Sequence, residues 1–431
     1  MALIEPRTLK GFRDYLPEQA IPREALIEKA RGIFRSYGFL PIDTPALEYE
    51  EILTGKGGEE SDKQLYRFED SGGRKVALRF DLTVPLARFI AQHSSELGLP
   101  FKRYHIATVW RGENTQRGRY REFMQCDFDT IGTESMVADV ETILVIHDLL
   151  RSIGIERFTI RINDRKYLTT LLNSYEFTEK QVEVLRMLDK LDKIGEDGVV
   201  AGIVGLGFKD FRAQELIRAL SALELGGHFT AVDDIRDRLQ GVRNSVLAAG
   251  VPAERVVLDH SIARGLDYYT GIVFETRLEG LPSIGSVCSG GRYDNLAQLY
   301  TKERLPGVGA SLGLDRLLAA MEELQLLPKT SATAPVFLAY FDPNHTSDYL
   351  RLAADLRASG IGVELYPEPK KLGAQLKYAD RRGFRFALVL GEDEWKSGTC
   401  QLKDLASATT RTLPVRGPDG KPSPELLAAL R

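Results

Sequence analysis

Arginine side chains occur in three separate stretches of this 431-residue sequence, and together they could bind phosphate. They are Arg111, Arg117, Arg119 and Arg121 in RGENTQRGRYR, Arg264 in RGLDYYTGIVFE, and Arg316 in SLGLDRLL. A guanidinium forms paired, charge-assisted hydrogen bonds with phosphate oxygens and keeps its proton at any physiological pH. Each stretch alone is a weak signal, but the three together favour a protein that handles anions through arginine.

The common glycine-rich phosphate loops are missing from the sequence. A Walker-type loop needs a lysine followed by serine or threonine, whereas Lys56 is followed by glycines. The stretch GVGASLG resembles a dinucleotide-binding loop, but Leu312 stands where the third glycine is required. Arginine therefore remains the main candidate for binding phosphate.

The stretch RGLDYYTGIVFE places an acid, Tyr268 and Tyr269 just before residues that alternate like a buried strand. Such hydrogen-bonding groups could line a binding pocket. Structural roles are also possible: the two tyrosines could be core residues, Asp127 and Asp129 could form turns, and Arg316 could extend its charged end to solvent. The first arginine stretch could likewise be a solvated hairpin, so these alternatives stay open at the level of single motifs.

Composition indicates a globular chain with two or three domains. The formal charge of -4 gives no general attraction to nucleic acid, so a polyanionic partner needs local basic patches. No apolar run is long enough for a membrane span and the start has no signal-peptide pattern, so we expect a cytoplasmic protein. The three cysteines and six histidines are scattered, and we expect neither disulfides nor a metal-ligand cluster.

The first 325 residues alternate between helical and extended patterns. Apolar spacing predicts a helix from about Pro22 to Gly38, and the prolines in FLPIDTPALEYE favour an edge strand or an irregular arm. Strand-like runs in and around residues 79–131, such as KVALRFDLTV and RYHIATVW, predict an antiparallel sheet. A helical block at about 170–250 interrupts two β-rich segments, so we interpret it as an insertion.

The last hundred residues form a separate pattern. LLPKTSATAP has the composition of a linker, which we place at 326–335. Strand and helix patterns then alternate through 336–431, which predicts a small, mainly parallel α/β domain.

The order of these segments resembles the class II aminoacyl-tRNA synthetases, and specifically the histidyl-tRNA synthetase family. GFRDYLP, FKRYHIATVWRGENTQRGRYREFMQCDFDTIG and GVGASLGLDRLL resemble the three class-defining motifs, and RGLDYYTGIVFE resembles the family's histidine-specific peptide. The resemblance covers nearly the whole chain. It implies a fold with an antiparallel-sheet catalytic domain over 1–325 carrying a helical insertion, followed by a C-terminal α/β anticodon-binding domain.

The resemblance also implies roles for individual residues. Neutral imidazole offers one donor and one acceptor, and Asp129 with Tyr269 is suited to bind both nitrogens. The remaining histidine-binding residues implied are Asp81, Thr83 and Gln125, which would hold the amino group, and Tyr268, which would form a pocket wall. The residues implied for ATP are Arg111, Glu113 and Arg316, with Arg264 and Arg111 as catalytic cations. The residues implied to meet the tRNA acceptor end are Gln116, Arg117 and Arg119.

The implied activity is that of an ATP-dependent ligase that joins histidine to the 3′ end of tRNA(His). The implied partners are ATP accompanied by Mg²⁺, L-histidine, tRNA(His) and a second copy of the chain, bound through residues 11–50. One alternative is a non-catalytic, histidine-binding regulatory paralogue that serves ATP phosphoribosyltransferase. Such paralogues typically lack the anticodon domain and an intact histidine peptide, and both are present here. A general RNA-binding α/β protein is a third possibility.

Overall fold

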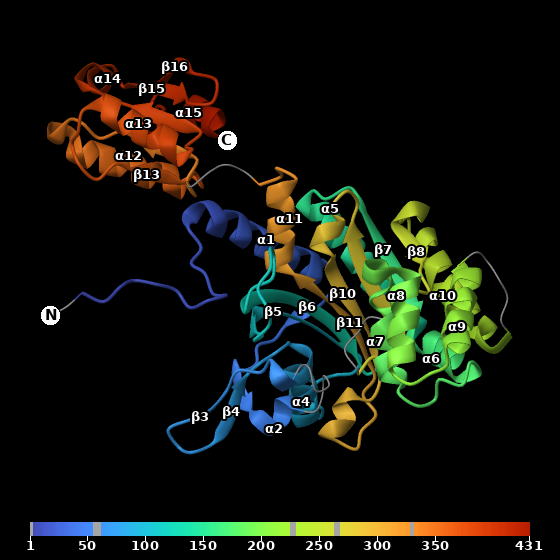
Figure 1. The fold of residues 1–431 in the computed structure, drawn as a ribbon. Coiled ribbons are helices and arrows are strands. Elements are labelled where there is room, and N and C mark those ends of the chain that lie inside the picture. The colour runs from blue at the N-terminus through green and yellow to red at the C-terminus, as the bar shows by residue number, and fades with distance from the viewer. Residues whose placement is uncertain (1–2, 55–61, 225–229, 263–267, 328–331) are drawn as a thin grey trace. The chain divides into compact units, whose positions relative to one another are not determined.

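The computed structural model describes residues 3–54, 62–224, 230–262, 268–327 and 332–431. These residues form two compact units. The first comprises the chain up to Arg13 together with Ala25–Leu326, and the second comprises Asp14–Glu24 together with Leu327–Arg431 (Figure 1). Helix α1, Pro17–Ser36, contributes to both units.

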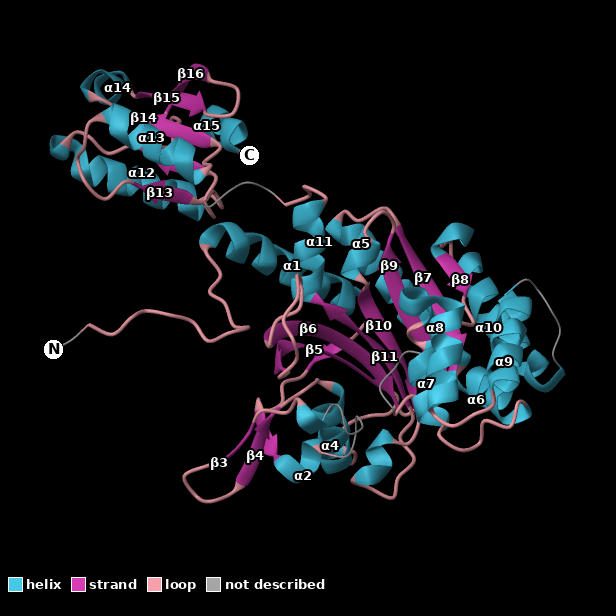
Figure 2. Cartoon of the chain, in the orientation of Figure 1, coloured by secondary structure: helices cyan, strands magenta, loops and turns pink. Residues whose placement is uncertain are grey.

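The first unit is built on an eight-stranded sheet in the order β1-β5-β6-β11-β10-β9-β7-β8 (Figure 2). Its strands are β1 Leu40–Pro41, β5 Phe101–Trp110, β6 Glu122–Ile131, β7 Phe158–Asp164, β8 Val256–Leu258, β9 Ile272–Leu278, β10 Ser286–Tyr293 and β11 Gly307–Gly313. The six strands from β5 to β7 pair antiparallel, whereas the short edge strands β1 and β8 pair in parallel with their neighbours. The predicted antiparallel sheet is confirmed, and the proline-containing segment lies at its edge as expected.

One face of this sheet is apolar and covered by helices. Phe128 and Tyr104 lie opposite each other on β6 and β5, and the ring of Phe34 from α1 packs on both, with centroids 5.1 and 5.5 Å away. Helix α5, Met136–Ile153, is held at its start by the Ser135 side chain, which accepts the Val137 N–H. Because side chains alternate along a strand, the residues between these apolar positions point to the other face.

The opposite face of the sheet is polar. Across four neighbouring strands the register places Asp127, Ser311, Ser289 and Glu275 side by side in one row. In the next row, Gly309 is required by close packing: a Cβ there would lie 2.3 Å from the Oδ1 atom of Asp129. The glycine thus leaves space for a buried carboxylate on the polar face.

A small sheet and two helices extend from the N-terminal half. They are β2 Leu47–Tyr49, α2 Glu50–Leu53, β3 Arg67–Glu69, β4 Lys75–Leu78 and α4 Thr83–His93. The strand predicted for KVALRFDLTV is only partly correct, since β4 ends at Leu78. The Oδ1 atom of Asp81 accepts the backbone N–H groups of Thr83 and Val84, which stabilises a helix at this point instead.

The predicted helical character of the insertion is confirmed. Its helices are α6 Arg165–Ser174, α7 Gln181–Leu188, α8 Leu191–Gly205, α9 Asp210–Glu224 and α10 Asp233–Ala248. They share a core of their own that includes Leu171, Phe177 and Leu216. Helix α10 packs on α5, β7 and β8, so the insertion lies beside this edge of the large sheet (Figure 1). Helix α11, Leu314–Glu323, directly follows β11.

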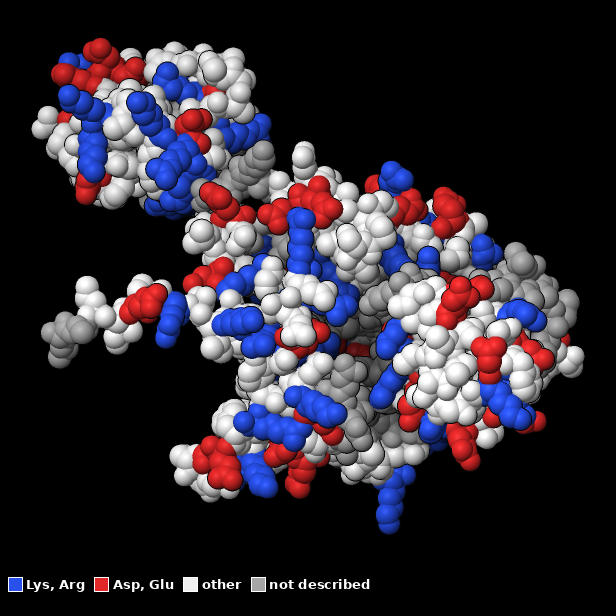
Figure 3. Space-filling view, in the orientation of Figure 1, with Lys and Arg blue, Asp and Glu red and all other residues white. Residues whose placement is uncertain are grey.

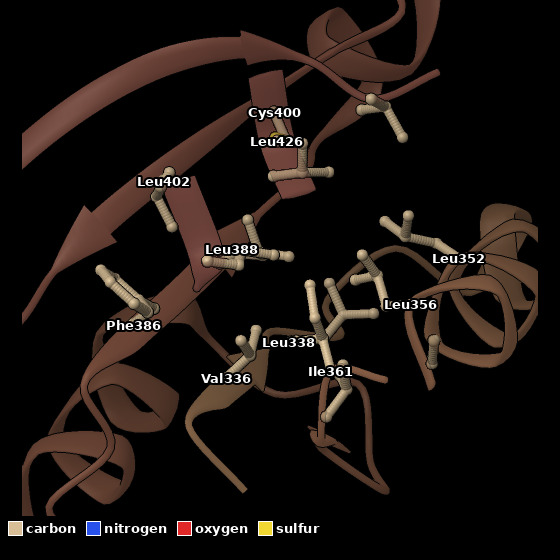
Figure 4. Close-up of a cluster of buried hydrophobic side chains, with 14 of the residues drawn as sticks. Val336, Leu338, Leu352, Leu356, Ile361, Phe386, Leu388, Cys400, Leu402 and Leu426 are labelled. Carbon is tan, nitrogen blue, oxygen red and sulfur yellow. The ribbon is translucent and has the colours of Figure 1, made fainter. Parts of the chain in front are cut away.

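The second unit contains a five-stranded sheet in the order β13-β12-β14-β15-β16. Its elements are β12 Val336–Leu338, α12 Thr346–Ala358, β13 Val363–Leu365, α13 Leu372–Arg382, β14 Phe386–Val389, α14 Glu392–Ser397, β15 Thr399–Asp404, β16 Thr409–Pro414 and α15 Pro424–Leu430. The predicted helices and parallel strands are present, but β15 and β16 pair antiparallel, so the sheet is mixed. Leu338, Leu352 and Leu388 contribute to a core shared by this sheet and α12 (Figure 4).

Short 3₁₀ helices complete the structure at Thr230–Val232, Ala253–Arg255, Pro282–Ile284, Leu296–Leu299 and Pro343–His345. Within the described residues, no helix combines the length and the apolar character needed to cross a membrane. The three cysteines, all buried, form no disulfide.

Candidate active site

A cavity of about 310 Å³ opens on the polar face of the first unit's sheet. Its wall includes Asp81, Thr83, Arg111, Glu113, Arg119, Gln125, Tyr268, Tyr269 and Arg316 from the set of predicted site residues. These residues come from the start of α4 and the chain just before it, from β6 and the loop that joins it to β5, from the chain before β9, and from α11. The space-filling view shows a hollow on this face with acidic and basic side chains around it (Figure 3).

Asp81 and Thr83 lie where β4 gives way to α4. The Asp81 side chain is nearly buried, and burial raises its pKa, while the two backbone N–H donors and Arg111 oppose that rise. Its amide contacts fix the carboxyl group at the helix start. A carboxylate held in this way can accept hydrogen bonds from an ammonium group in the cavity.

Arg111 lies just after β5 and faces the cavity. Its guanidinium carbon is 4.2 Å from the ring centroid of Phe80 and 5.0 Å from that of Phe123, and its Nε donates to the Phe80 carbonyl at 3.0 Å. Burial lowers the pKa of Arg111, and Asp81 and Glu113 oppose this change. The ring contacts leave a positioned cation that can pair with a carboxylate or phosphate.

Gln125 is held on β6 by Ser311 on the neighbouring strand. Its Nε2 donates to the Ser311 hydroxyl at 2.7 Å. Its Oε1 is buried and has no hydrogen-bond partner among the described residues. Because a buried amide oxygen without a partner is costly, this atom is suited to accept a hydrogen bond from a bound ligand.

Three tyrosines pack edge to face at one end of the cavity. The ring of Tyr268 lies 5.0 Å from that of Tyr269 and 5.9 Å from that of Tyr293. Burial raises the pKa of both Tyr268 and Tyr269, and nearby carboxyl groups raise it further, so both hydroxyls stay protonated at neutral pH. A Cβ at Gly291 would lie 2.9 Å from the Tyr269 ring, so glycine is what lets the ring lie against the sheet.

Asp129 lies beneath this wall and is not among the residues that line the cavity. Its Oδ2 is 2.6 Å from the NH2 group of Arg103, and its Oδ1 accepts the Tyr293 hydroxyl at 2.5 Å. Burial raises the pKa of Asp129, and the ion pair with Arg103 opposes the rise. Asp127, in the adjacent row of the same face, has its pKa raised to about 7 by burial. Both acids lie on β6, so the interpretation of them as turn formers is wrong.

The loop between β5 and β6 forms one side of the cavity. Glu113, Gly118 and Arg119 line it, and the Arg119 NH1 group lies 3.7 Å from a Glu113 oxygen. Gln116 and Arg117 are placed elsewhere: Gln116 forms a backbone bridge with Arg119, and Arg117 pairs with Glu323 at 3.1 Å.

Arg316 lines the cavity from the first turn of α11, and its NH1 group donates to the backbone carbonyl of Ser286. This contact directs the side chain toward the start of β10, so the interpretation of Arg316 as merely extending to solvent does not describe its position. Arg264 lies outside the described residues.

Several wall residues were not singled out from the sequence: Glu275, Ser289, Ser311 and Asp315. Glu275 could have been recognised, because this acidic residue ends the stretch RGLDYYTGIVFE directly after three apolar strand residues. Among the described residues, no group of three or more His, Cys, Asp or Glu side chains could hold a metal ion.

Two strand-based segments frame the cavity on the antiparallel sheet: a strand, loop and strand that carry Arg111, and a strand and helix that carry Arg316. With a separate mixed α/β unit at the C-terminus, this arrangement is that of a class II aminoacyl-tRNA synthetase.

The comparison with known proteins gives the family. A family model described as "Histidyl-tRNA synthetase" matches residues 11–317, and one described as "Anticodon binding domain" matches residues 335–416. The histidine–tRNA ligase of Rhodopirellula baltica is 59% identical over 94% of both chains, and that of Wolinella succinogenes is 49% identical over 94% of this chain and 95% of its own. The crystal structure of histidyl-tRNA synthetase from Nostoc sp. PCC 7120 has a TM-score of 0.85 at 34% identity and covers 96% of this chain and 97% of its own. The chain belongs to the histidyl-tRNA synthetase family, and it is an ATP-dependent ligase.

Proposed function

We propose that this ligase joins histidine to tRNA(His) in two steps at the cavity of the first unit. In the first, the histidine carboxylate attacks the α-phosphorus of ATP and pyrophosphate leaves. In the second, a hydroxyl of the terminal tRNA ribose attacks the carbonyl carbon and AMP leaves. The observation that supports the proposal is that acid, amide and tyrosine groups line the same cavity as Arg111 and Arg316.

The amino acid would bind among Asp81, Thr83, Gln125 and the two tyrosines. Asp81 would accept from the ammonium group, with the unpartnered amide oxygen of Gln125 as a second acceptor. The protonated hydroxyl of Tyr269 would donate to one imidazole nitrogen. Asp129 would act from beneath the cavity wall. It would do so either through its negative charge or by moving relative to Arg103, its ion-pair partner, when histidine binds. A competitor without ring nitrogens would leave these buried polar groups unpaired, which is the physical basis for selectivity.

The nucleotide would bind where the arginines meet the cavity. Arg111 would stabilise charge on the α-phosphate as the carboxylate attacks, Glu113 would contact the adenine side, and Arg316 would hold the terminal phosphate. We assign the second catalytic cation to Arg264 on the family resemblance. These roles require positioned charges rather than a protein nucleophile.

Magnesium would arrive as part of the ATP substrate. Mg²⁺ keeps several waters and commonly uses one or two carboxylates in addition to phosphate oxygens. Glu275 lines the cavity and could supply such a carboxylate without a dedicated metal cage.

We propose that the two units, with a boundary near residues 326–335, divide the recognition of tRNA. Gln116, Arg117 and Arg119 would meet the acceptor end, and the second unit would bind the unstacked anticodon bases. Support for the second assignment comes from the anticodon-domain match and from the many Lys and Arg side chains on the displayed face of that unit (Figure 3). We place this reaction in the cytoplasm, where uncharged tRNA is available.

The test of this function is aminoacylation with each of the twenty amino acids. We expect tRNA(His) to be charged with histidine alone, with little charging of a tRNA that carries another anticodon and acceptor stem. Charging of tRNA(His) with several amino acids, or no preference for histidine, would contradict the proposed selection at this cavity.

A further inference from the structure

The segment just before α1 lies against two walls of the cavity without lining it. This segment, Gly11–Arg13, is called the N-terminal clasp below. Its chain runs past the loop between β5 and β6 before α1 begins (Figure 1). Phe12 secures it by packing on Tyr66, with ring centroids 6.1 Å apart.

Arg13 forms a partly buried ion pair with the start of α11. Its NH2 group lies 2.5 Å from the Oδ1 atom of Asp315, whose side chain is only 1% exposed. The Oδ2 atom of Asp315 accepts the Met124 backbone N–H at 2.8 Å. Asp315 therefore joins the clasp, β6 and α11, and it immediately precedes Arg316 on the cavity wall.

The same guanidinium also contacts the loop on the other wall. Its central carbon lies 3.8 Å from the ring centroid of Tyr120, which is a cation–π contact. The Arg121 N–H donates to the Gly11 carbonyl at 2.9 Å. Gly11 has φ +88°, and a Cβ there would lie 2.7 Å from the Arg121 side chain, so this approach needs glycine.

We propose that Arg13 is a positioning residue for the nucleotide part of the cavity. One guanidinium bridges the loop that carries Glu113 and the helix start that carries Arg316, and so it sets the spacing between these two groups. This inference rests on the proposed function, which assigns those groups to ATP.

The amino-acid part of the cavity is positioned by other contacts. The amides at the start of α4 hold Asp81, and Ser311 on β11 holds Gln125. Loss of the Arg13 bridge should therefore affect ATP far more than histidine, which a general loosening of the fold would not do.

The test is Arg13→Gln, assayed by histidine-dependent exchange of pyrophosphate into ATP. We expect the KM for ATP to rise about 10-fold, the scale for losing one charge-assisted hydrogen bond, while the KM for histidine stays within about 2-fold. Arg13→Lys keeps the charge but not the planar fork, so it should raise the KM for ATP by only about 3-fold. The matched control is Arg7→Gln, because Arg7 belongs to the same N-terminal stretch but is 80% exposed, and its pair with Glu5 is long at 3.8 Å.

A second measurement tests the positioning role of Arg13 independently of the proposed catalytic reaction. The dissociation constant of a non-hydrolysable ATP analogue, measured by calorimetry, needs no turnover and should rise with the KM. In the Asp315→Asn background, Arg13→Gln should raise the dissociation constant of the analogue by a factor at least 5-fold smaller than in the wild type, because the carboxylate that pairs with Arg13 is already absent.

The inference is overturned if Arg13→Gln binds the analogue like the wild type, if both KM values rise equally, or if the two substitutions are additive. A wild-type protein that binds the analogue but exchanges no pyrophosphate with histidine would contradict the proposed function alone, since the analogue measurements would still decide the role of Arg13.

Discussion

Arg264 is the residue whose proposed role depends most on charge that develops during the reaction. A cation that interacts mainly with the transition state lowers kcat and kcat/KM together when it is removed. We therefore expect Arg264→Ala to slow histidyl-adenylate formation by roughly 10²-fold to 10³-fold, with a much smaller change in the KM for histidine. Rapid-quench measurement of adenylate formation tests this. A normal rate with a large rise in histidine KM would reassign Arg264 to substrate binding.

His105 should make the stability of the first unit depend on pH. It is almost fully buried, with Nε2 2.9 Å from an Asp43 oxygen. Burial, with Arg103 and Arg79, lowers its pKa to about 4, and the Asp43 carboxylate opposes this. An unfolded histidine titrates near 6.5, so the unfolded chain binds more protons between these values. We expect the free energy of unfolding to fall by about 3 kcal/mol as pH drops from about 6.5 to 4.

Urea unfolding of the wild type and His105→Gln across this pH range checks the expectation. A Trp395→Phe background leaves Trp110, which lies in the first unit, as the reporter. Glutamine cannot titrate, so the pH dependence of the wild type should exceed that of the variant. Parallel curves would show that His105 contributes nothing.

The residue types of the site could be predicted from the sequence. Whether each side chain lines the cavity or lies buried beneath its wall could not. Gln125 and Tyr269 line the cavity as expected from the motifs that carry the family resemblance, and Asp81, for which the resemblance also implies a role, lines it from just before α4. Asp129 was expected at the imidazole but lies beneath the wall, because its position is set by Arg103 on the neighbouring strand. Because Arg103 and Asp129 are 26 residues apart in the chain, their ion pair leaves no local pattern in the sequence.

At the scale of elements, strand β11 shows how closely the sheet is packed beneath the cavity. A Cβ at Gly309 would lie 2.3 Å from both the Phe128 carbonyl oxygen and Asp129 Oδ1. Gly309→Ala should therefore destabilise the first unit by about 1–3 kcal/mol or more, as overpacking does. Gly241 is the matched control: it lies inside α10, where the nearest side-chain atom to a new Cβ is 3.9 Å away.

Gly241→Ala should instead stabilise the protein, by up to about 1 kcal/mol, because alanine is the better helix former. Thermal unfolding followed by Trp110 fluorescence in the Trp395→Phe background measures both changes. Equal effects at the two positions would show that the spacing at β11 is less tight than the structure indicates.

Helices with regular apolar spacing were predictable, and elements fixed by polar contacts were less so. Helix α12 buries Tyr349, Leu352 and Leu356 as its spacing indicates. Helix α4 was missed because it follows an alternating run and begins through the side chain of Asp81. The hairpin of β15 and β16 was also missed, since β16 is largely exposed and lacks the apolar alternation of a buried strand.

At the scale of the whole molecule, the segment from Gly11 to Glu50 is proposed to join two copies of the chain. Leu40 is 56% exposed and Tyr49 is 52% exposed, and both would be better buried against a partner. We expect light scattering at micromolar concentration to give twice the chain mass of 48.1 kDa. Tyr49→Glu should shift the protein toward the monomer, whereas Leu350→Glu, at a similarly exposed position in the second unit, should not. An active wild-type monomer at this concentration would contradict the proposal.

The measurement that tests the central claim most directly is the exchange of labelled pyrophosphate into ATP, with the wild type and Tyr269→Phe, as histidine is varied. Exchange by the wild type should require histidine. Loss of the Tyr269 hydroxyl should raise the KM for histidine by about 10-fold and leave the KM for ATP nearly unchanged. Exchange that ignores histidine, or a Tyr269→Phe variant with the wild-type histidine KM, would contradict the claim that this cavity selects and activates histidine.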